Sequence, residues 1–537
     1  MMRRTVAILV WVWAFAVSAM AVPARREGMI RTAADGTEKT VYLHGDAFFH
    51  YMTDADGNWL DEESLMPISA EQKATQLEQG KTRVQARRKQ QTQMASAPKL
   101  PPRGLLLLVN FQNKSFVTPY DTIREMLNGE NFHRRYKLDY TYTSEGETRV
   151  VKKTIEASGS ARQYFRDQSF GAYCPTFDIM GPFTVSQDYS YYGKNNDAKV
   201  GEMVKEACQL ADQQGADFTL YDSDNDGEVD FVYILYAGEG EADGGPANTI
   251  WPHNYNLSAL RVSCTLDGKD INNYACSNEW QHYGNVYNGI GTFCHEFSHV
   301  LGLPDLYETS SVSTGVHTSL EWDIMDYGPY NNDGNTPPDY SAYERFYCGW
   351  LTPRVLTAPE SVWLGILRYN KSALLMCEGD SHNLVGYDPY PNTFYLLENR
   401  AQMGWDQYLP GKGLLITKIQ YNYNKWTLNM VNNSSKKMGV DILEATANNT
   451  KHAVSTDAYP AGATEFTEFS GHEITEIELD EQGAISFSYR GAKKTPIESV
   501  DDGQTAQKVL KDGQILIVRG DKTYDMLGRE TVSLLDK

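Results

Sequence analysis

The sequence has no excess of basic residues. Its 537 residues include 49 lysines and arginines against 70 aspartates and glutamates, which gives a net charge of −21. A polyanion such as nucleic acid, or an anionic membrane surface, would be repelled by most of such a surface. We therefore expect no nucleic-acid partner.

Long hydrophobic runs are absent beyond the start of the chain. Arg3 and Arg4 precede an apolar run over residues 5–17, and the small residues Ala19 and Ala21 follow it. Residues 1–24 are typical of a signal peptide, with an uncleaved anchor as the alternative. No later stretch reaches the roughly 20 apolar residues that a membrane-spanning helix needs. We therefore expect a secreted or cell-surface protein with no transmembrane segment.

Cysteine is absent from the first 173 residues, and the seven cysteines lie between Cys174 and Cys377. The odd number leaves at least one thiol unpaired, and spacing alone does not define the pairs. A bridge between Cys264 and Cys276 and a pair of free buried thiols are both compatible with the sequence.

The composition and length of the chain are compatible with several globular domains. Hydrophobic residues make up 41% of the chain and charged residues 22%, the usual balance for a protein with a buried core. At roughly 100–200 residues per domain, the length allows about three or four parts. We divide the chain at changes of pattern into residues 1–24, 25–100, 101–351, 352–492 and 493–537.

The segment 25–100 has two different halves. Short apolar runs alternate with turn signals over residues 38–60, which predicts a small β-rich lobe. Residues 70–99 are rich in Gln, Lys and Arg, with almost no aromatic residues. This composition predicts an exposed linker that is open to trypsin-like cleavage, with a solvated helix as the alternative.

The next two segments differ in their secondary-structure patterns. Residues 104–111 and 231–236 are apolar runs of strand length, typical of strands buried on both faces. Helical patterns occur at 119–128, 159–169 and 197–213. We therefore predict an α/β (α+β) fold for 101–351. Short β patterns at 394–398, 413–420 and 484–489 predict that 352–492 is mainly β.

Two histidines begin the most specific motif of the chain, GIGTFCHEFSHVLGLPDLY at 289–307. His295 and His299 are one helical turn apart, so both imidazoles can reach one metal ion, and Glu296 beside them can hold a water molecule. Gly302 can end the helix with a sharp turn that returns Asp305 to the metal. Three protein ligands leave a fourth position open, which is typical of a catalytic zinc site.

A second motif, WDIMDYG, follows at 322–328. Met325 in a tight turn can form an apolar floor under the zinc ligands. Tyr327 can reach the metal or an oxyanion, or it can simply cap the turn.

With these motifs, residues 104–350 resemble the catalytic domain of a metzincin, specifically the immune inhibitor A type of secreted bacterial metalloprotease. The resemblance extends to IWPH at 250–253 and, less closely, to YLLENR at 395–400. Most metzincins carry a third histidine where this chain has Asp305, and an aspartate there is characteristic of the immune inhibitor A type. The resemblance implies a small mixed sheet with an active-site helix at its lower edge.

The same resemblance implies a secreted zinc endopeptidase that acts on proteins or peptides. Glu296 would be the general base for a zinc-activated water and would return the proton to the leaving amine. Tyr327 would stabilise the oxyanion. The alternative is a surface-binding protein that uses its β-rich segment and has only incidental or weak protease activity. The intact Glu296 argues against it, because a non-catalytic descendant could lose that residue freely.

The acidic loop DSDNDGEVD at 222–230 matches a calcium-loop pattern, with Gly227 at the sharp turn. An EF-hand would carry a glutamate where this chain has Tyr233, and a strand pattern follows, so we predict a structural Ca²⁺ site that leads into a strand. A solvated acidic turn is the alternative. The candidate ligands are Asp222, Asp224, Asp226, Glu228 and Asp230.

The segment ahead of the predicted catalytic domain is most simply a propeptide, so we expect a zymogen. The absence of cysteine before Cys174 excludes a cysteine switch. Latency would come from a steric block or from an aspartate, with Asp46, Asp54 and Asp56 as candidates. Residues 507–530 resemble the C-terminal sorting domains of the type IX secretion pathway, which implies the outer-membrane secretion machinery as a partner. A β-hairpin appendix is the alternative.

Overall fold

The computed structural model describes residues 20–492 with short gaps, together with parts of the tail. The gaps are 34–35, 37, 91–96, 145–146, 282–287, 311–315 and 448–451, and the described tail residues are 506–511, 514–519, 522–524 and 530–531. The chain forms two compact units, residues 1–492 and 493–537. Most of the predicted signal peptide, residues 1–19, lies outside the described residues.

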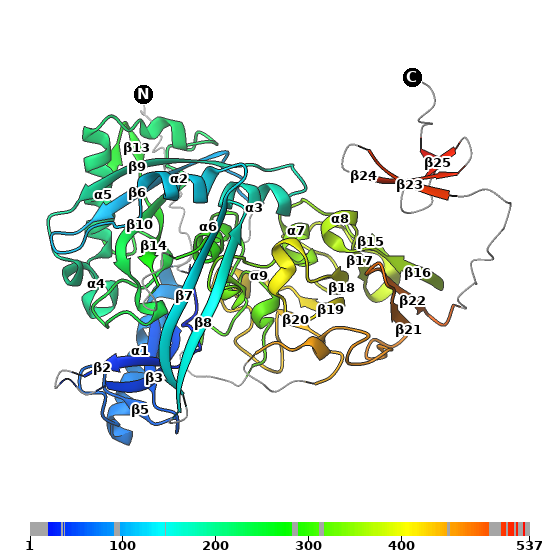
Figure 1. The fold of residues 1–537 in the computed structure, drawn as a ribbon, viewed down its shortest axis with the longest axis horizontal. Helices are drawn as coiled ribbons and strands as arrows, with labels where there is room; N and C mark the ends of the chain where they lie inside the picture. The colour runs from blue at the N-terminus through cyan, green and yellow to red at the C-terminus, as the bar shows by residue number, and fades with distance from the viewer. Residues whose placement is uncertain are drawn as a thin grey trace, which may run out of the picture. The chain divides into compact units, whose positions relative to one another are not determined.

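A mixed six-stranded sheet is the centre of the first unit, with the strand order β1-β11-β14-β10-β6-β9. Figure 1 labels its strands β14, β10, β6 and β9. The four strands from β14 to β9 are parallel neighbours, whereas β11 runs antiparallel to β14, and β1 runs antiparallel to β11. The bounds are β1 Met20–Ala21, β6 Arg103–Asn110, β9 Thr176–Thr184, β10 Val232–Glu239, β11 His253–Asn256 and β14 Asn273–Trp280. The apolar runs at 104–111 and 231–236 thus coincide with the two innermost parallel strands.

Side chains of β6 alternate between two hydrophobic cores, as a strand buried on both faces requires. Leu105 and Leu107 pack in one core with Met203 of α5, whereas Leu106 and Leu108 pack in the other with helices α2, α3 and α6. The bounds are α2 Tyr120–Asn128, α3 Ala161–Gln168, α4 Tyr189–Asp197, α5 Val200–Gln213, α6 Gly291–Val300 and α7 Ala342–Tyr347. The mixed α/β character predicted for 101–351 is confirmed.

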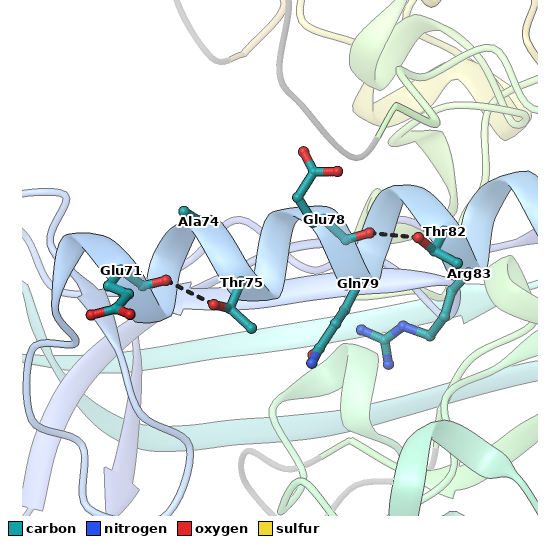
Figure 2. Close-up of a pocket in the computed structure, with 7 residues that line it drawn as sticks. All are labelled: Glu71, Ala74, Thr75, Glu78, Gln79, Thr82 and Arg83. Atoms are coloured by element: carbon teal, nitrogen blue, oxygen red, sulfur yellow. Dashed lines mark hydrogen bonds between the residues drawn. The ribbon is translucent and has the colours of Figure 1, made fainter.

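A small four-stranded sheet and a long helix form the N-terminal lobe, with the bounds β2 Met29–Thr32, β3 Glu38–Asp46, β4 Phe49–Thr53, β5 Trp59–Leu60 and α1 Ala70–Gln90. Residues 70–90 are therefore helical, the second of the two alternatives for this stretch. Figure 2 shows side chains of α1 that line a pocket, and in this helix Thr75 and Thr82 donate hydrogen bonds to the carbonyls of Glu71 and Glu78. Helix α1 packs closely on the sheet, since a Cβ at Gly80 would lie 2.2 Å from the Phe49 ring.

A long hairpin that the sequence patterns do not predict links the lobe to the central sheet region. Its strands are β7 His133–Ser144 and β8 Glu147–Ser158, and β7 contacts both β2 and β3. In Figure 1 it extends from the neighbourhood of α2 and α3 down to the lobe. The hairpin therefore packs against the lobe, which is also joined covalently to the rest of the first unit.

Residues 352–492 contain two further sheets, with the strand orders β15-β17-β18-β19-β20 and β16-β22-β21. The bounds are β15 Arg354–Val355, β16 Glu360–Leu364, β17 Leu374–Met376, β18 Thr393–Arg400, β19 Gly413–Gln420, β20 Val440–Ile442, β21 Ile474–Leu479 and β22 Ile485–Tyr489, with the short helices α8 Leu367–Asn370 and α9 Tyr423–Thr427. Phe394 and Leu396 share a hydrophobic core with Phe293 and Phe297 of α6. The β-rich region and the central region are thus one packed body.

The remaining described strands are β12 Thr265–Leu266 and β13 Lys269–Asp270 in the first unit, and β23 Ala506–Lys511, β24 Gln514–Arg519, β25 Lys522–Tyr524 and β26 Glu530–Thr531 in the second. Among the described residues, no helix is long and apolar enough to cross a membrane.

A Cys264–Cys276 bridge is not formed, and the cysteines are free thiols. Cys276 lies 3.5 Å from the His253 ring, whereas the thiol partner of Cys264 is Cys208 of α5.

Candidate metal centre and cleft

Helix α6 ends in a turn that brings three ligand-type side chains together. Gly302 has a φ of 98°, and its N–H donates to the carbonyl of His299. The next N–H, that of Leu303, donates back to Ser298 at 3.2 Å. This pair of bonds is a Schellman motif, in which a glycine at positive φ reverses the chain. The reversal carries residues 303–305 back under the helix.

The side chains of His295, His299 and Asp305 converge on one point. The Nε2 atoms of the two histidines are 3.1 Å apart, and the Asp305 Oδ1 atom lies 3.2 Å and 3.3 Å from them. Tetrahedral zinc with bonds of about 2.0–2.1 Å would place its ligand atoms about 3.3 Å apart, so the spacing fits zinc. All three side chains are buried.

The tautomers of both histidines are set by backbone carbonyls. His295 Nδ1 donates to the Ile324 carbonyl and His299 Nδ1 to the Leu303 carbonyl, each at 2.7 Å. Each Nε2 therefore carries a lone pair directed at the other and at the Asp305 carboxylate. Burial lowers the pKa of His299, which favours its neutral form. Two lone pairs and one anion facing each other in a buried site require a cation.

Asp305, the third candidate ligand, is oriented by a residue of the β-rich region. Asn429 donates from Nδ2 to Asp305 Oδ2 at 2.6 Å and accepts the Asp305 N–H at its Oδ1 atom at 2.9 Å. Asn432 and Asn433 add bonds to the Leu306 carbonyl and the Thr309 N–H. No local pattern singles out Asn429, because 124 residues separate it from Asp305. The only sequence signal is the run NMVNN at 429–433.

An extended segment, residues 20–26, lies beside the metal centre. Strand β1 is the edge strand of the central sheet and pairs with β11, with Ala21 opposite His253. The Val22 N–H donates to Glu296 Oε1 at 3.0 Å, and the Tyr307 hydroxyl donates to the Ala21 carbonyl. Burial raises the pKa of Glu296. The carboxylate that the motif predicts as a base therefore faces a peptide bond.

This geometry agrees with comparisons to known proteins. Residues 96–350 match the catalytic domain of the immune inhibitor A peptidase M6 family. The chain is 30% identical over 215 residues to the pre-pro-metalloprotease PrtV of Vibrio cholerae, and 26% identical over 244 residues to immune inhibitor A of Bacillus thuringiensis. These alignments cover 35% and 40% of this chain but only 23% and 34% of the two relatives. The similarity is therefore limited to the segment that matches the M6 family, residues 96–350, which we call the M6-like segment, and it does not extend over the whole length of either relative.

Two tyrosines of the M6-like segment contact residues 20–26. Tyr307, two residues after Asp305, is buried against the Ala21 carbonyl, and the motif analysis missed it. Tyr327 instead has the Arg26 guanidinium over its ring at 3.4 Å. Met325 is fully buried in the core that also contains Phe297 of α6, and its carbonyl accepts the Leu306 N–H.

The acidic loop is charge-compensated by lysines. Carboxylate oxygens of Asp222, Asp224 and Asp226 lie within 4.8 Å of one another. Lys269 contacts Asp222 at 2.6 Å, and Lys99 contacts Asp224 at 2.8 Å. A calcium ion would have to displace both ammonium groups.

The last two candidate ligands of this loop, Glu228 and Asp230, already accept hydrogen bonds from other residues. Asp230 accepts the Ser223 N–H, and Glu228 accepts from Asn273 at 3.0 Å. Burial raises the pKa of Glu228 to about 7.

The three aspartates considered for latency lie in turns of the lobe. The half-buried Asp54 carboxylate accepts hydrogen bonds from the N–H and the side-chain amide of Asn58, and Asp56 is in the same turn. Asp46 accepts the N–H groups of Phe48 and Phe49. The group that contacts Glu296 is the Val22 backbone, which favours a steric block.

Proposed function

We propose that this chain is a secreted zinc endopeptidase, made as a zymogen, that hydrolyses peptide bonds of extracellular proteins. The observation that carries the proposal is the placement of an extended peptide, residues 20–22, between strand β11 and Glu296, next to three converging candidate metal ligands. A peptidase has to bind its substrate as an extended strand with one peptide bond at the metal.

His295, His299 and Asp305 would hold the zinc ion. When bound, the ion would lower the pKa of a water molecule and polarise the substrate carbonyl. Glu296 accepts a proton from the attacking water and passes it to the leaving nitrogen. Its Oε1 atom already contacts a peptide nitrogen, that of Val22, which supports the second transfer.

Tyr307 donates a hydrogen bond to the carbonyl of the bond being cleaved. The hydroxyl contacts the Ala21 carbonyl, which belongs to the same peptide bond as the Val22 nitrogen. A donor at this place would stabilise the negative charge that develops on the oxygen. The competing assignment gives the role to Tyr327, which would have to exchange its contact with Arg26 for one with the substrate.

Latency in the exported chain, from which residues 1–24 have been removed as the signal peptide, would come from Arg25, Arg26 and the N-terminal lobe that follows them. Cleavage near residues 87–103 would release them. The acidic loop is proposed as a structural Ca²⁺ site with Asp222, Asp224, Asp226, Glu228 and Asp230 as candidate ligands, and the tail as a signal for the outer-membrane secretion machinery.

The test is cleavage of casein by the processed chain, with and without a chelator, for wild type and Glu296→Gln. We expect activity that the chelator abolishes and zinc restores, and a loss of at least about 1,000-fold in the variant with zinc still bound. Tyr408→Phe, a change at an exposed residue outside the metal centre, is the control. Zinc-loaded protein without turnover on any peptide would favour the alternative, a surface-binding protein.

A further inference from the structure

Residues 21 and 22 lie in the register of a substrate at its cleavage site. The Ala21 carbonyl faces Tyr307, and the Val22 nitrogen faces Glu296. Hydrolysis requires a donor at the carbonyl oxygen and an acid at the leaving nitrogen of one and the same peptide bond. Residues 22–26 therefore lie where the C-terminal side of a substrate would bind.

Backbone groups of this segment are held by bonds that any peptide could form. Trp251 Nε1 donates to the Val22 carbonyl at 3.0 Å, and the Tyr330 hydroxyl donates to the Pro23 carbonyl at 2.6 Å. The Arg25 N–H donates to the Ala242 carbonyl at 3.1 Å. Main-chain bonds of this kind give affinity without selecting a sequence, so selection has to come from side-chain pockets.

The Arg25 side chain fills a buried acidic pocket. Its Nε atom lies 3.3 Å from Asp243 Oδ1 and its Nη1 atom 3.8 Å from Asp333 Oδ1, and the guanidinium lies 4.9 Å from the centre of the Tyr330 ring. Arg25 is 4% exposed, and the two aspartates are 2% and 8% exposed. A guanidinium is thus bound here by two carboxylates and an aromatic face.

The pocket is built from groups that do not belong to the lobe. Asp243 Oδ2 accepts from Asn278 of β14 at 2.9 Å and from Asn288 at 3.3 Å. Asp333 is contacted by Lys153 of β8, which neutralises part of its charge. When the lobe and residues 22–26 leave, the two asparagines still hold Asp243 in this orientation. Its buried carboxylate has then lost Arg25 and needs another cationic partner.

We propose that Asp243 and Asp333 form a specificity pocket for a substrate arginine at the fourth residue after the cleaved bond. This inference rests on the proposed peptidase function. Arg25 is the fourth residue after the Ala21–Val22 bond, so in the chain that still carries residues 1–24 this segment occupies the pocket in substrate register. Arginine binds better than lysine, because its planar guanidinium can contact two carboxylates and stack on Tyr330 at once.

The test compares peptides that differ only at that position, with the processed enzyme recovered from the expressed full-length chain. Quenched fluorescent peptides carry Arg, Lys or Ala there. We expect kcat/KM to be at least about tenfold higher for Arg than for Ala, mainly through KM, with Lys between them. In Asp243→Asn the Arg-to-Ala ratio falls below about three.

Glu241→Gln is the matched control, since Glu241 is a buried acid two residues away whose partner is His50 of the lobe, at 3.4 Å. This variant keeps the Arg-to-Ala ratio of wild type. Thermal unfolding of both variants verifies that they are folded. Equal kcat/KM for Arg and Ala peptides in wild type would overturn the pocket while leaving the peptidase proposal intact.

A binding measurement separates the pocket from the chemistry. The peptides Val-Pro-Ala-Arg-Arg-Glu and Val-Pro-Ala-Ala-Arg-Glu are titrated into processed Glu296→Ala protein. The first binds at least about tenfold more tightly if the pocket exists. Such a preference without turnover of any substrate by wild type would support the pocket and contradict the peptidase proposal, whereas equal affinities would overturn the pocket.

Discussion

Replacing Asn429 by glycine should weaken zinc binding without touching a ligand. Asn429 has a φ of 51°, a conformation that glycine adopts freely, so the change removes the side chain with little backbone strain. It deletes the 2.6 Å bond to the Asp305 carboxylate and the 2.9 Å bond from the Asp305 N–H. Asp305 would then be free to rotate away from the two histidines.

The magnitude follows from these two bonds. A hydrogen bond to a charged group contributes about 1.5–3 kcal/mol and a neutral one about 0.5–1.5 kcal/mol, part of which water would recover. Loss of a residue that orients a metal ligand typically costs about 10–100-fold in affinity, or about 1.4–2.8 kcal/mol. We therefore expect the zinc Kd of Asn429→Gly to rise about 10–100-fold.

The assay is competition for zinc with a chromophoric chelator at fixed pH. Asn433→Ala is the matched control, because Asn433 makes the same kind of long-range bond, to the Thr309 N–H at 2.9 Å, but does not contact Asp305. The control should keep its zinc Kd within about threefold of wild type. An unchanged Kd in Asn429→Gly, or an equal loss in both variants, would refute the idea that the β-rich region orients the third ligand.

Three further predictions concern other parts of the chain. Tyr307→Phe should lower kcat of the processed enzyme by about 100-fold or more, and Tyr327→Phe by less than about threefold; the reverse order in peptide kinetics would assign the oxyanion to Tyr327. After export, Cys208 and Cys264 should form a disulfide that stabilises the folded state by roughly 4 kcal/mol. Mass spectrometry without reduction should detect the two cysteines in one linked peptide, and alkylation of both thiols without prior reduction would contradict this prediction. Millimolar Ca²⁺ should raise Tm by at least about 2 °C in wild type and not in Asp224→Asn, and equal melting curves would favour a lysine-neutralised turn.

The convergence of His295, His299 and Asp305 was predictable because its geometry is local. His295 and His299 meet through the period of one helix, and Asp305 follows from a glycine that turns the chain. The buried strands could also be predicted from the sequence, because a continuous apolar run of strand length, such as residues 104–111, is typical of a strand that is buried on both faces.

Long-range contacts were not predictable in the same way. The contact between Val22 and Glu296 joins residues 274 positions apart, and no local period encodes it. The role proposed for Tyr307 depends on the Ala21 carbonyl that lies against it. The hairpin 133–158 has polar and apolar residues without a turn signal strong enough to fix its register. Chain topology decides these contacts, and a single sequence does not reveal topology at that distance.

Anomalous diffraction at the zinc edge, from crystals of the full-length chain, tests the central claim most directly. We predict one strong peak about 2.0–2.1 Å from His295 Nε2, His299 Nε2 and Asp305 Oδ1, with residues 20–26 in the cleft beside it. Zinc-soaked crystals with no peak at these three atoms, or with the ion bound at the acidic loop 222–230 instead, would contradict the account.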